Sequence, residues 1–382
     1  SSGGEADVYS KKMLSRECLS AFIVPGNTMS EGYRIEFRGQ EMAEISFDMG
    51  NSRDLERVIR HFTVDEIIIH GLVGYPKPKI LDLVDFLSGL KKNNDRLVLT
   101  CVVHDYFSVC PIRDLLDHEI KYCGVPSDLN YCNKCLAINP LMKFAVPYVQ
   151  ADYPNLTIAL WRQKFGDLLA CSSGIICFSQ NSIEILQKAY PDLPSDKFEI
   201  ASHPVDQLRP VVIHKTSEMI NIAILDHMTI QNGAQIISQL ASYVDYYNLN
   251  IRFHIFGNVL EPAESFGLLK PLVRHAEFQP SDLPNLMEDN EIDLVLAPSI
   301  YPQTFLYAIE AAMRMHLPVA VFDIGASVER VKFYDMGMVL RQQDPKYMVE
   351  AMGEYLNKKI SLSFGAKAVS YTHLRAHETV LD

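Results

Sequence analysis

The stretch of sequence that decides the fold reads Leu294-Val-Leu-Ala-Pro-Ser-Ile-Tyr-Pro-Gln-Thr-Phe305, and it is followed by Leu317-Pro-Val-Ala-Val-Phe322. The continuous apolar runs predict strands at Leu294–Ala297 and Val319–Phe322, because a parallel strand that is buried on both faces has no polar alternation. Between them, Phe305–Met315 has apolar residues at helical spacing. A proline-rich turn therefore connects a buried strand to a helix and a second strand, as in a parallel α/β sheet.

The same alternation of strand and helix extends over the rest of the chain. Further strands are predicted at Glu66–His70, Leu97–Val103, Gly174–Phe178, Ile220–Leu225, Ile251–Phe256 and Met338–Leu340. Further helices are predicted at Ile80–Leu90, Ile158–Ala170, Ser182–Tyr190, Ala234–Tyr246, Leu283–Glu288 and Tyr347–Leu356. Two parallel-sheet domains in sequence predict a cleft between their strand ends, where open α/β sheets bind ligands.

The predicted domains are residues 1–205 and 206–360, with the hinge near His203 and Pro204. The N-terminal domain opens on a glycine-containing segment before the strand-like Ala21–Val24, so we expect that its first strand is missing. Residues 361–382 have no hydrophobic period and resemble a translated sequencing adapter. We therefore expect a non-native tail there.

Composition narrows the class of protein. Of 382 residues, 48% are hydrophobic and 21% are charged, which is typical of a packed globular chain rather than a disordered one. The formal net charge of -12 makes the chain a poor general binder of nucleic acid. No signal peptide and no apolar run of about 20 residues is visible in the sequence, so a cytoplasmic location is expected.

The turn that ends at Phe305 predicts an anion site. Backbone N–H groups at a helix N-terminus, together with the helix dipole, favour a diphosphate. Gln303, Thr304 and Phe305 lie in this turn, and Glu310 follows on the helix, where a carboxylate can accept hydrogen bonds from ribose hydroxyls. The alternative is that Gln303 and Glu310 only cap and solvate the helix.

These residues resemble family 4 of the retaining GT-B glycosyltransferases, whose hallmark is an acidic pair separated by seven residues and followed by a Leu-Pro-Val strand. The resemblance covers about Ile220–Leu340. It departs from the family at both acidic positions, which fall on Gln303 and on Ala311, one residue after Glu310.

The resemblance implies an α/β fold of the GT-B type, with two Rossmann-like domains facing across a cleft. It implies a transferase that moves a sugar from a nucleotide-diphosphate sugar to a glycan or lipid-linked acceptor, with retention of configuration and no required metal or cofactor. The family expectation is synthesis of a bacterial cell-surface polysaccharide, with peripheral contact at the inner face of the membrane.

A second motif of this family falls on the segment Ile222–Gly233. In the family this strand, loop and helix supply two cationic side chains that grip the diphosphate. The resemblance places these two positions at His227 and at Asn232, just before Gly233. Gly257 ends the next strand, as the family's glycine does. Charged contacts to phosphate are stronger than neutral ones, so we expect weak donor binding or compensation from other groups.

The N-terminal half offers a second candidate site. His104 and Asp105 follow the predicted strand Leu97–Val103 and resemble the family's His-Asp loop, where the histidine contacts the donor sugar. We therefore predict that these two residues are catalytic, against the alternative of a structural histidine. Gly3 and Gly4 resemble the family's glycine pair, which allows the backbone to approach the substrate.

Four cysteines cluster in one irregular segment, predicted to span residues 104–135. Cys110, Cys123, Cys132 and Cys135 include one Cys-x-x-Cys knuckle, and four thiolates suit tetrahedral zinc. Similar loops occur in some bacterial members of the family, so a structural zinc is one hypothesis. The alternative is four small apolar residues in an ordered loop.

Two other functions stay open at the level of the sequence. A catalytically degenerate GT-B protein that acts as scaffold or partner subunit would explain why the two cations are replaced at His227 and Asn232. Epimerisation of a nucleotide sugar is the other, and it needs an acid/base carboxylate set that the sequence does not reveal.

Overall fold

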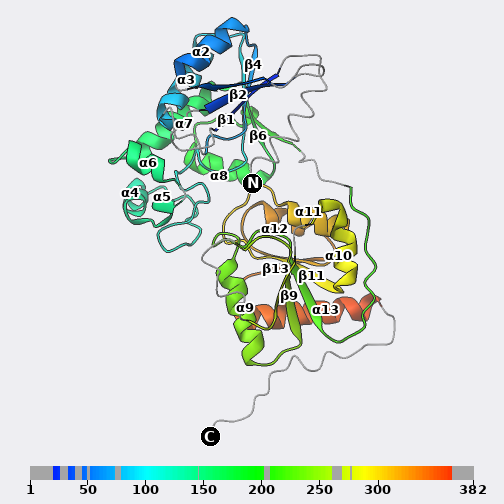
Figure 1. Cartoon of the computed structure of the whole chain (residues 1–382). Helices are drawn as coiled ribbons and strands as arrows, with labels where there is room; N and C mark the ends of the chain where they lie inside the picture. The colour runs from blue at the N-terminus through cyan, green and yellow to red at the C-terminus, as the bar shows by residue number, and fades with distance from the viewer. Residues whose placement is uncertain are drawn as a thin grey trace. The chain divides into compact units, whose positions relative to one another are not determined.

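A computed structural model describes residues 20–25, 33–38, 45–49, 52–73, 79–144, 146–201, 207–259, 269–275 and 278–363. The chain divides into two compact units, Ser1–Pro204 and Val205–Asp382 (Figure 1). The N-terminal unit has two sheets and the C-terminal unit has one, each unit has its own helices, and each is described by itself below. Residues 361–363, expected to belong to a non-native tail, continue the last helix, and residues 364–382 lie outside the described part.

The N-terminal unit is built on a four-stranded parallel sheet. In sheet order its strands are β4 (Glu66–Ile69), β5 (Val98–Val102), β6 (Gly174–Cys177) and β7 (Phe198–Ile200). The predictions of the first three strands are confirmed. The strand β7 was missed, because its three residues are too short to give a periodic signal.

Helices α3 (Ile80–Lys92), α7 (Ile158–Cys171) and α8 (Gln180–Ala189) accompany this sheet, as predicted. The helices α3 and α7 pack against each other, because the apolar side chains of each gather on one face. The hydroxyls of Thr157 and Ser179 accept backbone N–H groups at the starts of α7 and α8 and so fix where these helices begin.

The beginning of this unit differs from the parallel pattern of the rest. Strands β1 (Ser20–Pro25), β2 (Tyr33–Arg38) and β3 (Ile45–Met49) form a separate antiparallel sheet and are followed by α2 (Ser52–His61). The expected strand at Ala21–Val24 is confirmed, but it pairs in a meander and not in a parallel sheet. Neighbouring antiparallel strands need only short connections, which fits the six to seven residues between these strands.

The segment predicted to be irregular over residues 104–135 is irregular only as far as Asp128. Helix α4 (Leu129–Ile138) begins there, capped by the Asp128 carboxylate, and α5 (Leu141–Phe144) and α6 (Pro147–Asp152) follow. The irregular part is packed rather than exposed, since Tyr106, Phe107 and Ile112 are each at most 2% exposed. The buried Trp161 on α7 donates its indole N–H to the Phe107 carbonyl at 2.7 Å and ties this part to the helix.

The C-terminal unit contains a six-stranded sheet in which every strand pair is parallel. In sheet order its strands are β10 (Leu272–Arg274), β9 (Ile251–Ile255), β8 (Ile220–Ile224), β11 (Ile292–Ala297), β12 (Val319–Phe322) and β13 (Gly337–Leu340). The five predicted strands are confirmed, and the short β10 was missed. The central strands are buried along almost their whole length, which explains their continuous apolar sequences.

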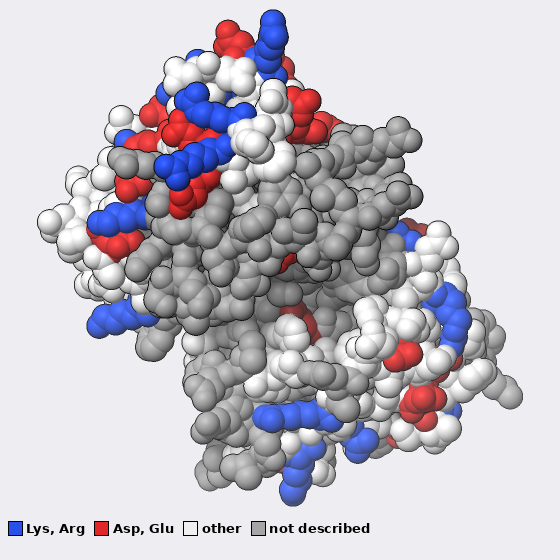
Figure 2. Space-filling view, turned by 45° about the horizontal axis from the view of Figure 1, so that its top comes forward, with Lys and Arg blue, Asp and Glu red and all other residues white. Residues whose placement is uncertain are grey.

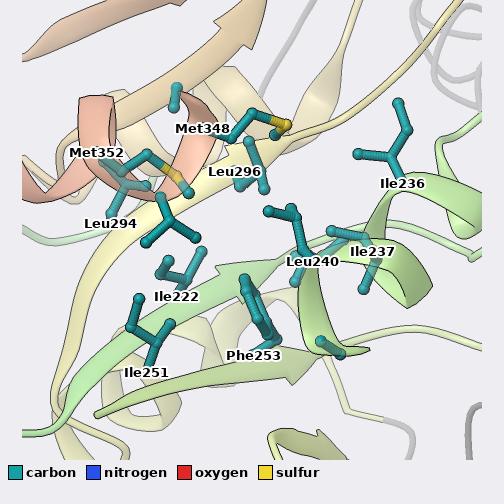
Figure 3. Packing of buried hydrophobic residues seen from close by; sticks show 14 of the residues in the cluster. Ile222, Ile236, Ile237, Leu240, Ile251, Phe253, Leu294, Leu296, Met348 and Met352 are labelled. Atoms are coloured by element: carbon teal, nitrogen blue, oxygen red, sulfur yellow. The ribbon is translucent and has the colours of Figure 1, made fainter. Parts of the chain in front are cut away.

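Helices cover both faces of this sheet (Figure 1). Helices α9 (Ala234–Tyr246) and α13 (Pro345–Ser363) pack on one face, around a cluster that includes Phe253 and Leu240 (Figure 3). Helices α10 (Leu283–Asp289), α11 (Tyr307–Arg314) and α12 (Gly325–Val331) pack on the other. Burial of each large apolar side chain stabilises the unit by about 1.5–3 kcal/mol. The helix α12 was not predicted.

Short 3₁₀ turns complete the described elements, at Ser195–Lys197 and Pro280–Asp282. No helix in the described ranges combines the length and the apolar character that a membrane crossing needs. Figure 2 shows Lys and Arg side chains interspersed with Asp and Glu over the described part of one face. Because the two signs alternate, that part carries no extended field of one sign.

Candidate functional site

The candidate site of the C-terminal unit lies where β8 and β11 end. These strands are parallel neighbours at the centre of the sheet, so the loops that follow them leave from the same edge. The Ile300 N–H after β11 donates to the Gln231 carbonyl after β8 at 3.0 Å and joins the two loops. Such an edge of an open parallel sheet is where ligands bind in this architecture.

Gly233 allows the two loops to come this close. It caps the N-terminus of α9 with φ +83°, a left-handed conformation that costs other residues about 1–2 kcal/mol. A Cβ atom at this position would lie 2.2 Å from the carbonyl oxygen of Pro298. The predicted Gly233 is therefore required both by its backbone conformation and by the approach of the loop after β11.

Gly257 has a similar packing role at the end of β9. A Cβ atom there would lie 2.3 Å from the Asp226 carbonyl oxygen. The next residue, Asn258, donates its backbone N–H to Nδ1 of His227 at 3.0 Å. Since Nδ1 accepts, the neutral His227 ring carries its proton on Nε2 and can donate a hydrogen bond from there.

Asn232, the second expected phosphate ligand, contacts the first. Its amide Nδ2 donates to the His227 carbonyl at 3.0 Å, and its backbone N–H donates to the Thr229 hydroxyl at 3.2 Å. Its amide oxygen is buried and has no hydrogen-bond partner within the described part of the chain. His227 and Asn232 thus contact each other, and their grip on a diphosphate stays a prediction.

The turn after β11 is buried at its centre. Gln303 and Thr304 are 7% and 6% exposed, and Phe305 is half-buried. The amide nitrogen of Gln303 donates to the Tyr301 hydroxyl at 3.1 Å. Its amide oxygen is buried, and none of the residues that the structure describes donates a hydrogen bond to it. The Gln303 carbonyl accepts the Ala326 N–H at 3.1 Å, which fixes this turn to the start of α12.

Asp226 was not predicted, and it connects these residues. It follows β8, its carboxylate accepts the His227 N–H at 2.7 Å, and Gln303 donates a side-chain hydrogen bond to it. Burial raises the pKa of the Asp226 carboxyl, and these two hydrogen bonds oppose the rise. A polar residue directly after a buried central strand was the available signal in the sequence.

Glu310 lies in the first turn of α11 and is held by a partner that the sequence did not indicate. Both of its carboxylate oxygens accept from Arg330 of α12, at 2.5 and 2.9 Å. The side chain of Glu310 is 12% exposed, whereas Ala311 is fully buried in the core between α11 and the sheet. The family's second acidic position, which falls on Ala311, is therefore in the core, and the carboxylate of α11 lies one residue earlier, at Glu310, outside the core.

In the N-terminal unit, His104 lies just after the end of β5, as predicted. Its Nε2 is 3.1 Å from Nδ1 of His70, which directly follows β4, and the two rings are stacked. The Phe178 ring, directly after β6, packs on His104 with 5.2 Å between ring centroids. His70 was missed, although its place after a predicted strand matches that of His104.

Asp105, the other predicted catalytic residue, is engaged with the backbone. Its carboxylate accepts the Phe107 N–H at 2.8 Å and shapes the turn after β5. This contact gives Asp105 a structural role that the sequence prediction did not include. Gly3 and Gly4 lie outside the described residues.

The structure does not support a four-thiolate zinc site. All four cysteines are described, and among the described residues no group of three or more His, Cys, Asp or Glu side chains is placed to hold a metal ion. Burial raises the pKa of the Cys110, Cys123 and Cys132 thiols. Cys132 also hydrogen-bonds Arg162, and Cys135 accepts from the Asn139 amide at 3.6 Å.

No protein-family model and no curated protein sequence matches this chain. Among solved structures, sucrose-phosphate synthase from Thermosynechococcus elongatus is similar at 11% identity and a TM-score of 0.50, over 80% of this chain and 67% of that one. HepE of Anabaena, in complex with UDP and glucose, is similar at 14% identity and a TM-score of 0.48, over 81% of this chain and 72% of that one. The likeness to sucrose-phosphate synthase shows the fold, and the chain has two Rossmann-like parallel-sheet units of the GT-B type.

Proposed function

We propose that this chain is a glycosyltransferase that moves a sugar from a nucleotide-diphosphate sugar to a glycan or lipid-linked acceptor. The shared GT-B fold and the family 4 pattern over about Ile220–Leu340 support the proposal. The observation that carries it is the pair of buried amide oxygens on Gln303 and Asn232 at one sheet edge, neither of which has a hydrogen-bond partner among the described residues. An unsatisfied buried acceptor costs about 1–3 kcal/mol, which a polar ligand with hydroxyl groups would recover.

The difficult step in such a transfer is the departure of the diphosphate from an oxocarbenium-like sugar. Donors that point at the leaving oxygens stabilise that charge, and the N-terminus of α9 behind Gly233 supplies backbone N–H groups of this kind. His227 adds a donor at Nε2 even when its ring is neutral, because Asn258 occupies Nδ1. This donor partly replaces the cation that the family has at this place.

The roles of the other candidates follow the same geometry. Gln303 would accept a sugar hydroxyl, and Glu310, held by Arg330, would accept the ribose hydroxyls. For His104, the family resemblance alone suggests a contact with the donor sugar. Retention of configuration, chemistry without a metal, and peripheral contact with the inner face of a membrane are parts of the proposal that rest on the family resemblance.

Calorimetric titration with UDP, GDP and ADP tests the nucleotide site directly. Glu310→Ala should weaken binding of the preferred nucleotide about tenfold or more, because a charge-assisted hydrogen bond is worth about 1.5–3 kcal/mol. Glu288→Ala is the matched control. Glu288 on α10 also forms a bidentate pair with an arginine, Arg209, but α10 ends just before β11 begins, at the opposite edge of the sheet.

The two ways of failing are distinct. Binding by the wild-type chain with unchanged affinity in Glu310→Ala would exclude Glu310 as the ribose ligand. No binding of any nucleotide by the wild-type chain would overturn the transferase proposal. That result would favour a catalytically degenerate scaffold or partner subunit, in which His227 and Asn232 no longer grip a phosphate.

A further inference from the structure

Three neighbouring strands of the N-terminal unit each deliver a ring at the same edge. The strands β4, β5 and β6 are parallel and adjacent, and they are followed by His70, His104 and Phe178. His70 and His104 have 5.3 Å between ring centroids and 29° between ring planes. Phe178 packs against His104 at a centroid distance of 5.2 Å and tilts by 39°. The contacts with His70 and Phe178 thus both restrict the orientation of the His104 ring.

The polar contact joins Nδ1 of His70 to Nε2 of His104 at 3.1 Å. A neutral imidazole has one N–H donor and one bare nitrogen, so a hydrogen bond between two such rings needs one proton between the two nitrogens. If His104 donates from Nε2, its Nδ1 is an acceptor. If His104 accepts at Nε2, its neutral ring carries the proton on Nδ1 and that nitrogen is a donor.

We infer that His70 is the positioning residue of His104. It shares one proton with His104 and thereby sets both the ring orientation and the tautomer that His104 presents to a sugar hydroxyl. The contact between His104 and a sugar rests on the proposed function. The shared proton between His70 and His104 does not depend on it. Both rings are half-buried at the carboxyl edge of the sheet, the edge where ligands of open parallel sheets bind.

Nuclear magnetic resonance of the full chain, labelled with ¹⁵N at histidine, tests the pair without any substrate. A coupling between Nδ1 of His70 and Nε2 of His104 across the hydrogen bond is the expected result, and it should vanish in His70→Asn and His70→Phe. The chain contains its own reference, because His254 and His275 form a second contact of the same kind at 3.0 Å. A spectrum that shows the reference coupling but not the His70 coupling would overturn the inference.

Kinetics test what the pair does. An asparagine amide can occupy the place of Nδ1, so His70→Asn should keep most of kcat, whereas His70→Phe should lower kcat about 10- to 100-fold through misplacement of His104. Nucleotide affinity, a property proposed for the C-terminal unit, should be unchanged in both variants. Equal kcat in the wild type and His70→Phe would refute the positioning role. A chain without transferase activity would refute the proposed function and leave the coupling experiment standing.

Discussion

At the scale of single residues, both the fold and the candidate site depend on the absence of a side chain at Gly233. Gly233→Ala places a methyl group 2.2 Å from the Pro298 carbonyl oxygen, at a φ of +83°. Strain of this kind costs about 1–3 kcal/mol before any clash is relieved, so we expect unfolding at least a few degrees lower in temperature. Thermal melts by circular dichroism measure the shift.

Gly89→Ala is the control for that substitution. Gly89 lies inside α3 without a positive φ, and a methyl group added there would meet no neighbouring atom within 4 Å. Alanine should therefore stabilise the helix by about 0.5–1 kcal/mol. Both substitutions add one methyl group, but Gly233→Ala should lower the stability of the protein and Gly89→Ala should raise it. A Gly233→Ala variant as stable as the wild type would show that the two loops separate easily.

At the level of residues, the sequence indicates which side chains share an edge where a polar residue follows a predicted strand. His227, Asn232 and Gln303 lie at one edge because β8 and β11 are neighbours. Two important partners were missed for a physical reason. Arg330 reaches Glu310 across 20 residues, and His70 reaches His104 across 34, and no local pattern encodes contacts of that kind.

At the scale of elements, the buried His254 and its partners join three strands and should make the C-terminal unit sensitive to acid. His254 on β9 is 3% exposed and contacts Asn221 Oδ1 on β8 at 3.1 Å and His275, just after β10, at 3.0 Å. Because Asn221 Oδ1 accepts, the neutral ring has its proton on Nε2, and Nδ1 accepts from His275. Protonation of His254 places a proton on Nδ1, so His275 would have to change from donor to acceptor to keep the contact.

The pKa shift gives the sign and the window of this effect. Burial first, and then His275, Arg252 and Lys215, lower the pKa of His254 to about 4 from 6.5. The unfolded chain then binds more protons between these two values, so stability is full above about pH 6.5 and falls as the pH drops towards 4. A shift of this size corresponds to about 3 kcal/mol.

Urea unfolding at pH 7, 5.5 and 4.5 measures this dependence by circular dichroism. His254→Leu should be less stable than the wild type at pH 7, because Asn221 and His275 lose a partner, but its stability should change less with acid. His214→Gln removes an exposed histidine of the same unit and should keep the wild-type slope. An identical slope in His254→Leu would assign the acid sensitivity to other groups.

The elements themselves were predictable in proportion to their length and burial. The strands β8, β11 and β12 are apolar at all positions except Asn221 and Asp293, because helices cover both faces of their sheet. The strands β7 and β10 have three residues each and gave no signal. The helix α12 begins at Gly325, and glycine usually indicates a turn. The sequence therefore predicts a turn in place of this helix.

At the scale of the whole molecule, the antiparallel sheet of β1, β2 and β3 was the least predictable part. The strand at Ala21–Val24 could be recognised, but its antiparallel pairing with β2 could not, since an apolar alternation does not state which strand lies beside it. The division into two units, by contrast, follows from two separate runs of strand and helix, each with its own sheet.

Trp161 allows the two units to be observed separately. It is the one tryptophan in the sequence, it is fully buried, and it belongs to the N-terminal unit, so its fluorescence reports unfolding of that unit. Circular dichroism reports both units. A nucleoside diphosphate that binds the C-terminal unit at 100 times its Kd should stabilise that unit by about 2.7 kcal/mol.

We therefore expect the nucleotide to move part of the circular dichroism transition to higher temperature and to leave the Trp161 transition in place. The corresponding nucleoside without phosphates is the control ligand and should move neither, because the proposed donors at α9 and His227 act on the diphosphate. Equal shifts of both transitions would mean that the units unfold together or that the N-terminal unit also binds the nucleotide. A shift of the Trp161 transition alone would place the nucleotide in the N-terminal unit and contradict the assignment of the site to the ends of β8 and β11.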